Sequence, residues 1–181
     1  MDLGPRSCAP TPARPPLLPL SSPRVASETL FDISSIDLRG VAATPEEVGR
    51  INPQAGHMRQ LDHVIWLSPD QTHALGIKHV RDDEFWVAGH IPGRPLYPGV
   101  LMIEAAAQLS SYLYKIRIDE SRFLGFVRCD KTIFRGQVVP GDQLLLLVRE
   151  IDFGRRRFSC LGQGVVNGAL VHETEITGMS M

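Results

Sequence analysis

The sequence lacks a surplus of charge of either sign, because 19 lysine and arginine residues face 20 aspartate and glutamate residues over 181 positions. Proteins that mainly bind nucleic acid need a concentrated basic surface, so this balance argues against that class. No apolar run approaches the roughly 20 residues that a membrane-spanning helix requires. The three cysteines are scattered and odd in number, so neither a disulfide framework nor a metal site is expected. We therefore expect a soluble globular protein of a reducing, cytoplasmic compartment.

Proline is concentrated at the beginning of the chain, where residues 1–28 hold seven of the fourteen prolines. Proline fixes φ and removes a backbone donor, so this stretch is predicted to be a disordered tail. Residues 29–57 are predicted to be a transitional segment with one short helix, whose start is marked by Thr44 and Glu47 in the spacing of a capping box. Residues 58–181 are predicted to form a single domain.

Within that domain the pattern is one of strands around a single helix. The segment Val100–Tyr114 is rich in good helix formers and apolar on nearly every side, so other structure should wrap it. Asn167-Gly168 between two apolar runs is typical of a tight hairpin. Strands are predicted at residues 61–67, 72–80, 123–128, 131–134, 143–153, 158–166 and 169–177. The fold class is therefore α+β, with an antiparallel sheet curled around a long central helix.

Glu104 is the one charged residue between Arg94 and Lys115. An ionised carboxylate inside a buried helix is costly unless it is paired, or unless its pKa rises and it keeps its proton. Helical spacing aligns Glu104 with Val100 and Gln108 on one stripe of the helix. Two interpretations stay open: Glu104 pairs with a basic residue to fix the helix, or it is a tuned acid in a pocket.

His90 stands at the entrance of a loop that three prolines stiffen, and such a loop is suited to holding a side chain in place. His90 and Glu104 could together supply a base and an acid that work near pH 7. The helix that begins near Gly99 adds free N–H groups able to polarise a carbonyl. These groups form a coherent set for removing a proton next to a carbonyl.

The segment from Gly89 to Gln108, GHIPGRPLYPGVLMIEAAAQ, closely resembles the signature of the 3-hydroxyacyl-(acyl-carrier-protein) dehydratases of the FabZ/FabA type. The triplet Asp62–Val64 and the turn Pro140–Asp142 extend the resemblance over residues 53–177. The resemblance implies the hot-dog fold, in which a sheet wraps around a long central helix.

The resemblance also implies a role for each candidate site residue. His90 would remove the α-proton of a 3-hydroxyacyl thioester, and Glu104 of the neighbouring subunit would protonate the departing hydroxyl. Glutamate rather than aspartate at this position resembles the FabZ branch. Gly99, with Val100 and Gln108, would bind the substrate, with the Gly99 N–H on the thioester carbonyl. No metal and no organic cofactor would be needed.

The partners implied are an acyl carrier protein that holds the substrate and further copies of the chain, in a homodimer or in a hexamer built as a trimer of dimers. Gly136-Gln137 stand where a basic residue and proline are common in the family, which removes one candidate contact for the carrier's acidic surface. The leading interpretation is dehydration to trans-2-enoyl thioesters in fatty-acid or related acyl-chain biosynthesis. Two alternatives remain: a hot-dog hydratase or thioesterase acting on acyl-coenzyme A, or a non-catalytic acyl-binding subunit.

Overall fold

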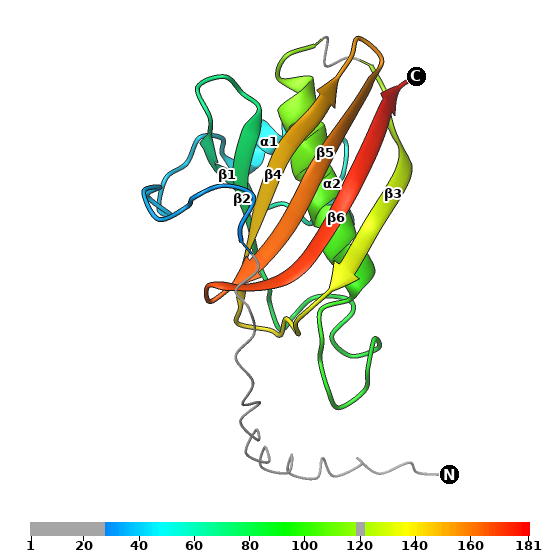
Figure 1. The fold of residues 1–181 in the computed structure, drawn as a ribbon. Coiled ribbons are helices and arrows are strands. Elements are labelled where there is room, and N and C mark those ends of the chain that lie inside the picture. Colours follow the sequence, from blue (N-terminus) through cyan, green and yellow to red (C-terminus); the bar gives the residue numbers. More distant parts are fainter. Residues whose placement is uncertain (1–27, 119–121) are drawn as a thin grey trace, which may run out of the picture.

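The computed structural model describes residues 28–118 and 122–181, in which a six-stranded antiparallel sheet curls around a helix (Figure 1). The elements are α1 (Pro45–Ile51), a short 3-10 helix (Gly56–Met58), β1 (His63–Leu67), β2 (His73–His79), α2 (Gly99–Lys115), β3 (Leu124–Phe134), β4 (Gln143–Phe153), β5 (Arg157–Val166) and β6 (Ala169–Ser180). The strand order β1-β2-β4-β5-β6-β3 leaves β1 and β3 at the two edges. The predicted tail lies outside the described residues, apart from Glu28.

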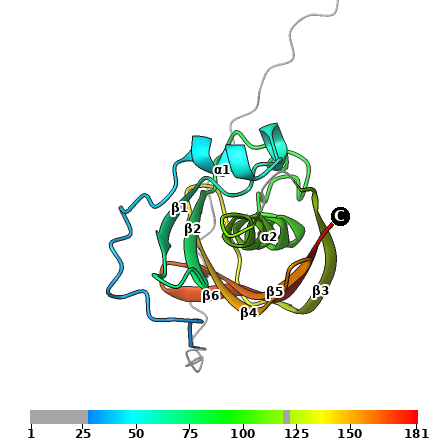
Figure 2. The same cartoon turned by 90° about the horizontal axis from the view of Figure 1, so that it is seen from above.

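Helix α2 occupies the concave face of the sheet, as the view along its axis shows (Figure 2). Its 17 residues contain no internal proline or glycine, so nothing interrupts the helix between its first residue and its last. Leu109 and Leu113 are fully buried in one apolar cluster with Leu144 and Leu146 of β4. The predicted central helix is thus confirmed, but its expected burial on nearly every side is not. Val100 is 70% exposed, because the curled sheet covers only part of the helix circumference.

Part of the outer, convex face of the sheet, on the side of β1 and β2, is covered by residues 28–43, which we call the N-terminal strap (Figure 2). Apolar side chains of the strap pack against residues of β1, β2, β4 and β5 in a second apolar cluster, which includes Leu30, Phe31, Ile33, Ile36, Ile65, Leu75, Ile77, Leu147 and Val165. The backbone N–H of Leu30 donates to Oε1 of Gln163 at 2.8 Å. The strap therefore belongs to the packed fold.

Several local predictions can be compared with the structure. Thr44 and Glu47 form both hydrogen bonds of a capping box at the start of α1. Asn167 and Gly168 both have positive φ, as the tight hairpin between β5 and β6 requires. The two strands predicted at 123–128 and 131–134 are one strand, β3, because Lys131 adopts a positive φ within a bulge and the pairing with β6 resumes beyond it.

No helix among residues 28–118 and 122–181 is both long and apolar enough to cross a membrane. The same residues contain no group of three or more histidine, cysteine, aspartate or glutamate side chains that could hold a metal ion.

Candidate active site

The loop of residues 81–98, which we call the His90 loop, joins β2 to α2 and is anchored by a buried ion pair. Lys78 Nζ lies 3.0 Å from Glu84 Oε1, and the two side chains are only 2% and 5% exposed. Such a pair is costly to bury unless further hydrogen bonds satisfy it. Here the indole N–H of Trp86 donates to Glu84 Oε2 at 3.2 Å, and the backbone N–H of Arg81 donates to Oε1 at 3.0 Å. The root of the loop is therefore fixed.

His90 is exposed, yet both its backbone and its ring are held. Its backbone N–H donates to the carbonyl of Trp86 at 2.8 Å, and its Nδ1 lies 2.9 Å from the carbonyl oxygen of Leu96. A carbonyl oxygen can only accept, so in the neutral ring Nδ1 carries the proton. Nε2 is left without a proton and can act as a base.

Glu104 is oriented by Gln108, which is only 1% exposed. Gln108 Oε1 accepts from the backbone N–H groups of Gln60 and Leu61 at 2.9 and 3.0 Å, which settles the orientation of the amide. Its Nε2 donates to the carbonyl of Met58 and to Glu104 Oε1, both at 2.7 Å. All four hydrogen-bonding positions of this amide are therefore used inside the protein. Oε1 of Glu104 thus accepts from this amide, and Oε2 makes no hydrogen bond to a described residue.

The structure also bears on the two interpretations of Glu104. Its carboxyl is half-buried rather than enclosed, and it makes no ion pair with any described residue. Among residues 28–118 and 122–181, its side chain has one hydrogen-bond partner, the amide of Gln108. A structural ion pair of Glu104 is therefore absent from the described part of the chain.

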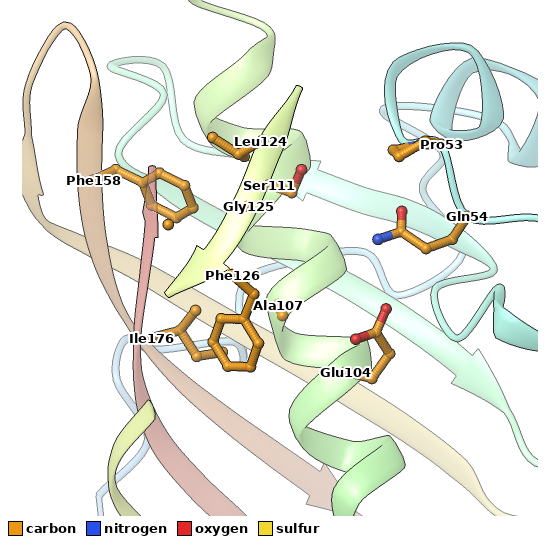
Figure 3. Close-up of a pocket in the computed structure, with 11 residues that line it drawn as sticks. Pro53, Gln54, Glu104, Ala107, Ser111, Leu124, Gly125, Phe126, Phe158 and Ile176 are labelled. Atoms are coloured by element: carbon orange, nitrogen blue, oxygen red, sulfur yellow. The ribbon is translucent and has the colours of Figure 1, made fainter. Parts of the chain in front are cut away.

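Glu104 lines a pocket that opens to solvent, which we call the α2–β3 pocket, with about 410 Å³ of empty space when the open solvent at its mouth is included (Figure 3). Its apolar walls come from α2 and from strands β3, β5 and β6, and they include Ala107, Leu124, Phe126, Phe158 and Ile176. Phe158 and Ile176 are 2% and 1% exposed. The pocket therefore combines apolar walls with the polar side chains of Gln54, Glu104 and Ser111.

Gly99 and Val100 form the start of α2. The first N–H groups of a helix have no partner within it, and here Leu101 is the first residue whose N–H bonds back, to the carbonyl of Pro98 at 2.9 Å. The N–H groups of Gly99 and Val100 can therefore receive a carbonyl oxygen. A Cβ at position 99 would lie 2.8 Å from the ring of Phe134, so that ring requires glycine there.

Behind that ring lies His172, which is fully buried on β6. Its ring stacks on Phe134 with centroids 5.6 Å apart, and neither ring nitrogen has a hydrogen-bond partner in the described part of the chain. Burial lowers the pKa of His172 to about 4. This histidine is therefore neutral at physiological pH and serves as packing beneath the helix start.

The structure brings some of the predicted residues together and separates others. Glu104 contacts Gln108, and Gly99 adjoins Val100, but no hydrogen bond or ion pair joins His90 to Glu104 within one chain. Lys78 and Glu84 were not among the residues predicted from the sequence. The signal was available, because a lysine inside the apolar run of β2 is as anomalous as a glutamate inside α2.

Known proteins resemble this chain both in sequence and in fold. Residues 52–175 match the FabA-like domain. The 3-hydroxyacyl-(acyl-carrier-protein) dehydratase FabZ of Bartonella quintana (strain Toulouse) is 35% identical over 138 residues, covering 74% of this chain and 87% of the relative. FabZ of Geotalea uraniireducens (strain Rf4) is 35% identical over 133 residues, covering 72% and 91%.

Two solved structures share the architecture at low identity. The dehydratase heterocomplex ApeI:P from Xenorhabdus doucetiae superposes with a TM-score of 0.64 at 16% identity, over 74% of this chain and 90% of that one. A mutant thioesterase from Pseudomonas aeruginosa gives 0.60 at 12% identity, over 77% and 95%. At these identities the similarity shows a common hot-dog fold and nothing about activity.

Proposed function

Since the chain belongs to the FabA-like family, with FabZ enzymes among its relatives, we propose that it removes water from 3-hydroxyacyl thioesters held on an acyl carrier protein. The products are trans-2-enoyl thioesters of fatty-acid biosynthesis. The observation that carries the proposal is the hydrogen bond from His90 Nδ1 to the carbonyl of Leu96, which leaves Nε2 as a base. The cytoplasmic location expected from the sequence is part of the proposal.

The reaction needs one base, one acid and one oxyanion donor. Nε2 of His90 takes the proton from C2, and the electrons form the C2–C3 double bond as the C3–O bond breaks. Oε2 of Glu104 gives its proton to the hydroxyl, which leaves as water. The N–H groups of Gly99 and Val100 stabilise the charge that develops on the thioester oxygen. Gln108 acts by positioning the carboxyl of Glu104.

We propose a homodimer in which each site takes His90 from one chain and Glu104 from the other. Strand β3 supports this, because it is a sheet edge with exposed apolar side chains at Phe126, Val127 and Ile133. Two β3 edges that pair about a twofold axis would join the sheets and set the open faces of the two α2 helices against each other. A trimer of such dimers is the larger assembly that the proposal allows.

Mixing two inactive variants tests the shared site. In a dimer of one His90→Ala chain and one Glu104→Gln chain, one site has both residues intact and the other has neither. Random pairing makes half of the dimers mixed, so a 1:1 mixture that is unfolded and refolded together should regain about a quarter of wild-type activity. Each variant refolded alone is the control. A mixture that stays inactive would show that each site is built within one chain.

Carrier preference separates the proposed dehydratase from a hydratase acting on coenzyme A. Arg94 supports carrier binding. Its Nη2 donates to Gln137 Oε1 at 3.2 Å, so its positive charge lies beside Gly136-Gln137, where a basic residue is common in the family. Turnover of the same 3-hydroxyacyl group on carrier protein and on coenzyme A should favour the carrier. Equal rates on both would contradict carrier recognition.

A further inference from the structure

The amide of Gln108, which orients Glu104, takes three of its four partners from one short stretch of backbone, residues 57–61. These partners are the carbonyl of Met58 and the N–H groups of Gln60 and Leu61. The stretch, which we call the Gln60 segment, begins in the short 3-10 helix and ends two residues before β1, so the ladder between β1 and β2 does not fix it. The position of the Glu104 carboxyl therefore depends on what holds the Gln60 segment.

The side chain of Gln60 ties this segment down at two points. Gln60 is only 1% exposed, and its Nε2 donates to the carbonyl of His57 at 2.6 Å, within the same segment. Its Oε1 accepts from the hydroxyl of Tyr97 at 2.7 Å. Because Nε2 faces a carbonyl, the orientation of the amide is settled and the hydroxyl is the donor. Tyr97 thus joins the Gln60 segment to a distant part of the chain.

Tyr97 is itself held firmly. It is 3% exposed, its ring lies edge-on to Trp86 with centroids 5.5 Å apart, and its backbone N–H donates to the carbonyl of Val138 at 2.8 Å. Burial raises the pKa of its hydroxyl, which therefore keeps its proton and stays a donor at physiological pH. Without this hydroxyl the buried Oε1 of Gln60 would lose its partner, which is costly inside a protein.

Tyr97 also borders the loop that holds the base. It follows Leu96, whose carbonyl lies 2.9 Å from Nδ1 of His90. The backbone before Tyr97 thus orients His90, whereas the hydroxyl acts on Glu104 through the two glutamines. In the proposed dimer, His90 and Glu104 of one chain belong to different sites. A change confined to the hydroxyl should therefore be felt in the site that holds this chain's Glu104 and not in the site that holds its His90.

We propose that Tyr97 is a positioning residue, whose hydroxyl holds the carboxyl of Glu104 in place for proton transfer. The effect runs through Gln60 and Gln108, neither of which gives or takes the proton. The inference rests on the dehydratase function and the shared site proposed above. Because the hydroxyl is buried and bonded within the protein, its removal should change kcat and not KM.

Removing the hydroxyl alone is the first test. Tyr97→Phe keeps the ring and its contact with Trp86, so it should fold. We expect kcat to fall about tenfold while KM stays within about twofold, because a displaced acid slows proton transfer without weakening binding. The measurement is steady-state turnover of a 3-hydroxyacyl carrier-protein substrate.

Tyr114→Phe is the matched control, because the hydroxyl of Tyr114 is also bonded inside the protein, to the carbonyl of Gly154 at 3.0 Å. It should lower the melting temperature by an amount similar to that of Tyr97→Phe, but leave kcat unchanged. A Tyr97→Phe protein with the kcat of the wild type would overturn the positioning role. So would an equal loss of kcat in Tyr114→Phe, since stability alone would then explain both.

Gln60→Leu tests the same link from its other end. It removes the acceptor of the Tyr97 hydroxyl and should lower kcat to a similar extent. In the double variant of Tyr97→Phe and Gln60→Leu, kcat should be close to that of Gln60→Leu alone, because both changes break one hydrogen bond. Losses that multiply to about a hundredfold would show that the two residues act independently, which would contradict the proposed route.

The decisive test places Tyr97→Phe in one chain of the mixed dimers described above. Their intact site takes Glu104 from the His90→Ala chain and His90 from the Glu104→Gln chain. Tyr97→Phe in the His90→Ala chain should lower the recovered activity about tenfold, whereas in the Glu104→Gln chain it should change it by less than about twofold. Equal losses in the two placements, or a loss confined to the Glu104→Gln chain, would overturn the inference.

Failure of the inference is distinguishable from failure of the proposed function. If Tyr97→Phe does not fold, Gln60→Leu takes its place in the mixed dimers, with the same expected difference between the two chains. If the mixture without either change is inactive, the kcat of the Tyr97→Phe protein decides. A wild-type protein that dehydrates no 3-hydroxyacyl substrate would overturn the dehydratase function itself.

Discussion

The His90 loop and helix α2 hold the two proposed catalytic side chains in opposite ways. His90 is exposed, its ring is oriented by one backbone carbonyl, and its loop depends on the buried pair of Lys78 and Glu84. Glu104 projects from a helix with eleven buried residues, and the amide that orients it makes four hydrogen bonds. The loop is fixed by a few strong interactions at its root, whereas the helix is part of the core.

This difference predicts how substitutions in the His90 loop and in helix α2 affect the protein. A loop with few buried contacts can open locally while the rest of the fold persists. A change in the core is felt by the whole domain, since its packing is continuous. Activity and stability should therefore change together for substitutions of buried residues and separate for substitutions of side chains outside the core.

The largest expected effect is a loss of kcat, and it should be similar for the loop residue His90 and for the helix residue Glu104. His90→Ala and Glu104→Gln should each lower kcat by about 100- to 10,000-fold, because each removes one proton-transfer group. Neither should lower the melting temperature, since His90 is exposed and glutamine can still accept from Gln108. His57→Ala, at another exposed histidine, is the control. Near-wild-type turnover of either variant would remove that residue from the mechanism.

The next largest effect is expected when the ion pair that anchors the His90 loop is removed. Glu84→Gln leaves Lys78 buried without its main partner, which typically costs about 3–5 kcal/mol. We expect hydrogen exchange to rise first in residues 81–98, together with a fall in kcat. Asp83→Asn is the matched control, because its carboxyl is 74% exposed and should change stability by less than about 1 kcal/mol. Uniformly faster exchange across the sheet would contradict local opening.

A third test acts on the helix side through pH. Burial lowers the pKa of His172 to about 4, whereas the unfolded chain binds the proton near the ordinary value of 6.5. Acidification therefore favours the unfolded state, and the stabilising neutral form is lost progressively as the pH falls from 6.5 to 4, by at most about 3 kcal/mol. The free energy of unfolding should fall less steeply over this range in His172→Leu. Identical slopes in both proteins would contradict the assignment.

The smallest expected effect is at Val100, on the open face of α2. If Val100 binds the substrate as we propose, Val100→Ser should raise KM by about fivefold with kcat and melting temperature unchanged, because the 70% exposed side chain is not part of the core. Val41→Ser, at a 58% exposed position on the strap, controls for loss of surface apolarity. An unchanged KM would remove Val100 from the substrate site.

Sequence reasoning predicted the parts of the fold that local chemistry determines. The central helix was predicted as Val100–Tyr114 and runs from Gly99 to Lys115, and β4 has the bounds predicted for it. Hairpin residues and the capping box were identified because their signals lie within a few positions. Two strands were predicted where β3 is one strand. Lys131, which has a positive φ, interrupts the strand pattern of the sequence, but the pairing of β3 with β6 resumes beyond it.

The rest of the site depends on partners that lie far apart in sequence. Gln108 was identified as a substrate-binding residue, and its contacts with Gln60 and Leu61, more than 45 positions away, follow only from the folded chain. The anchoring of the His90 loop by Lys78 and Glu84 is of the same kind. The packing of the strap was missed because an irregular segment carries no periodicity, and its docking face comes from four separate strands.

The strap has a consequence for how the chain is made. Leu30 bonds to Gln163, 133 positions later, and the cluster that receives the strap is completed by Val165 of β5. At the usual pace of about 5–20 residues per second, on the order of ten seconds pass between the synthesis of the strap and that of its docking site. During that interval Leu30, Phe31, Ile33 and Ile36 lack part of the cluster that buries them in the folded protein. The strap is thus made early but can complete its packing only after β5 has been synthesised.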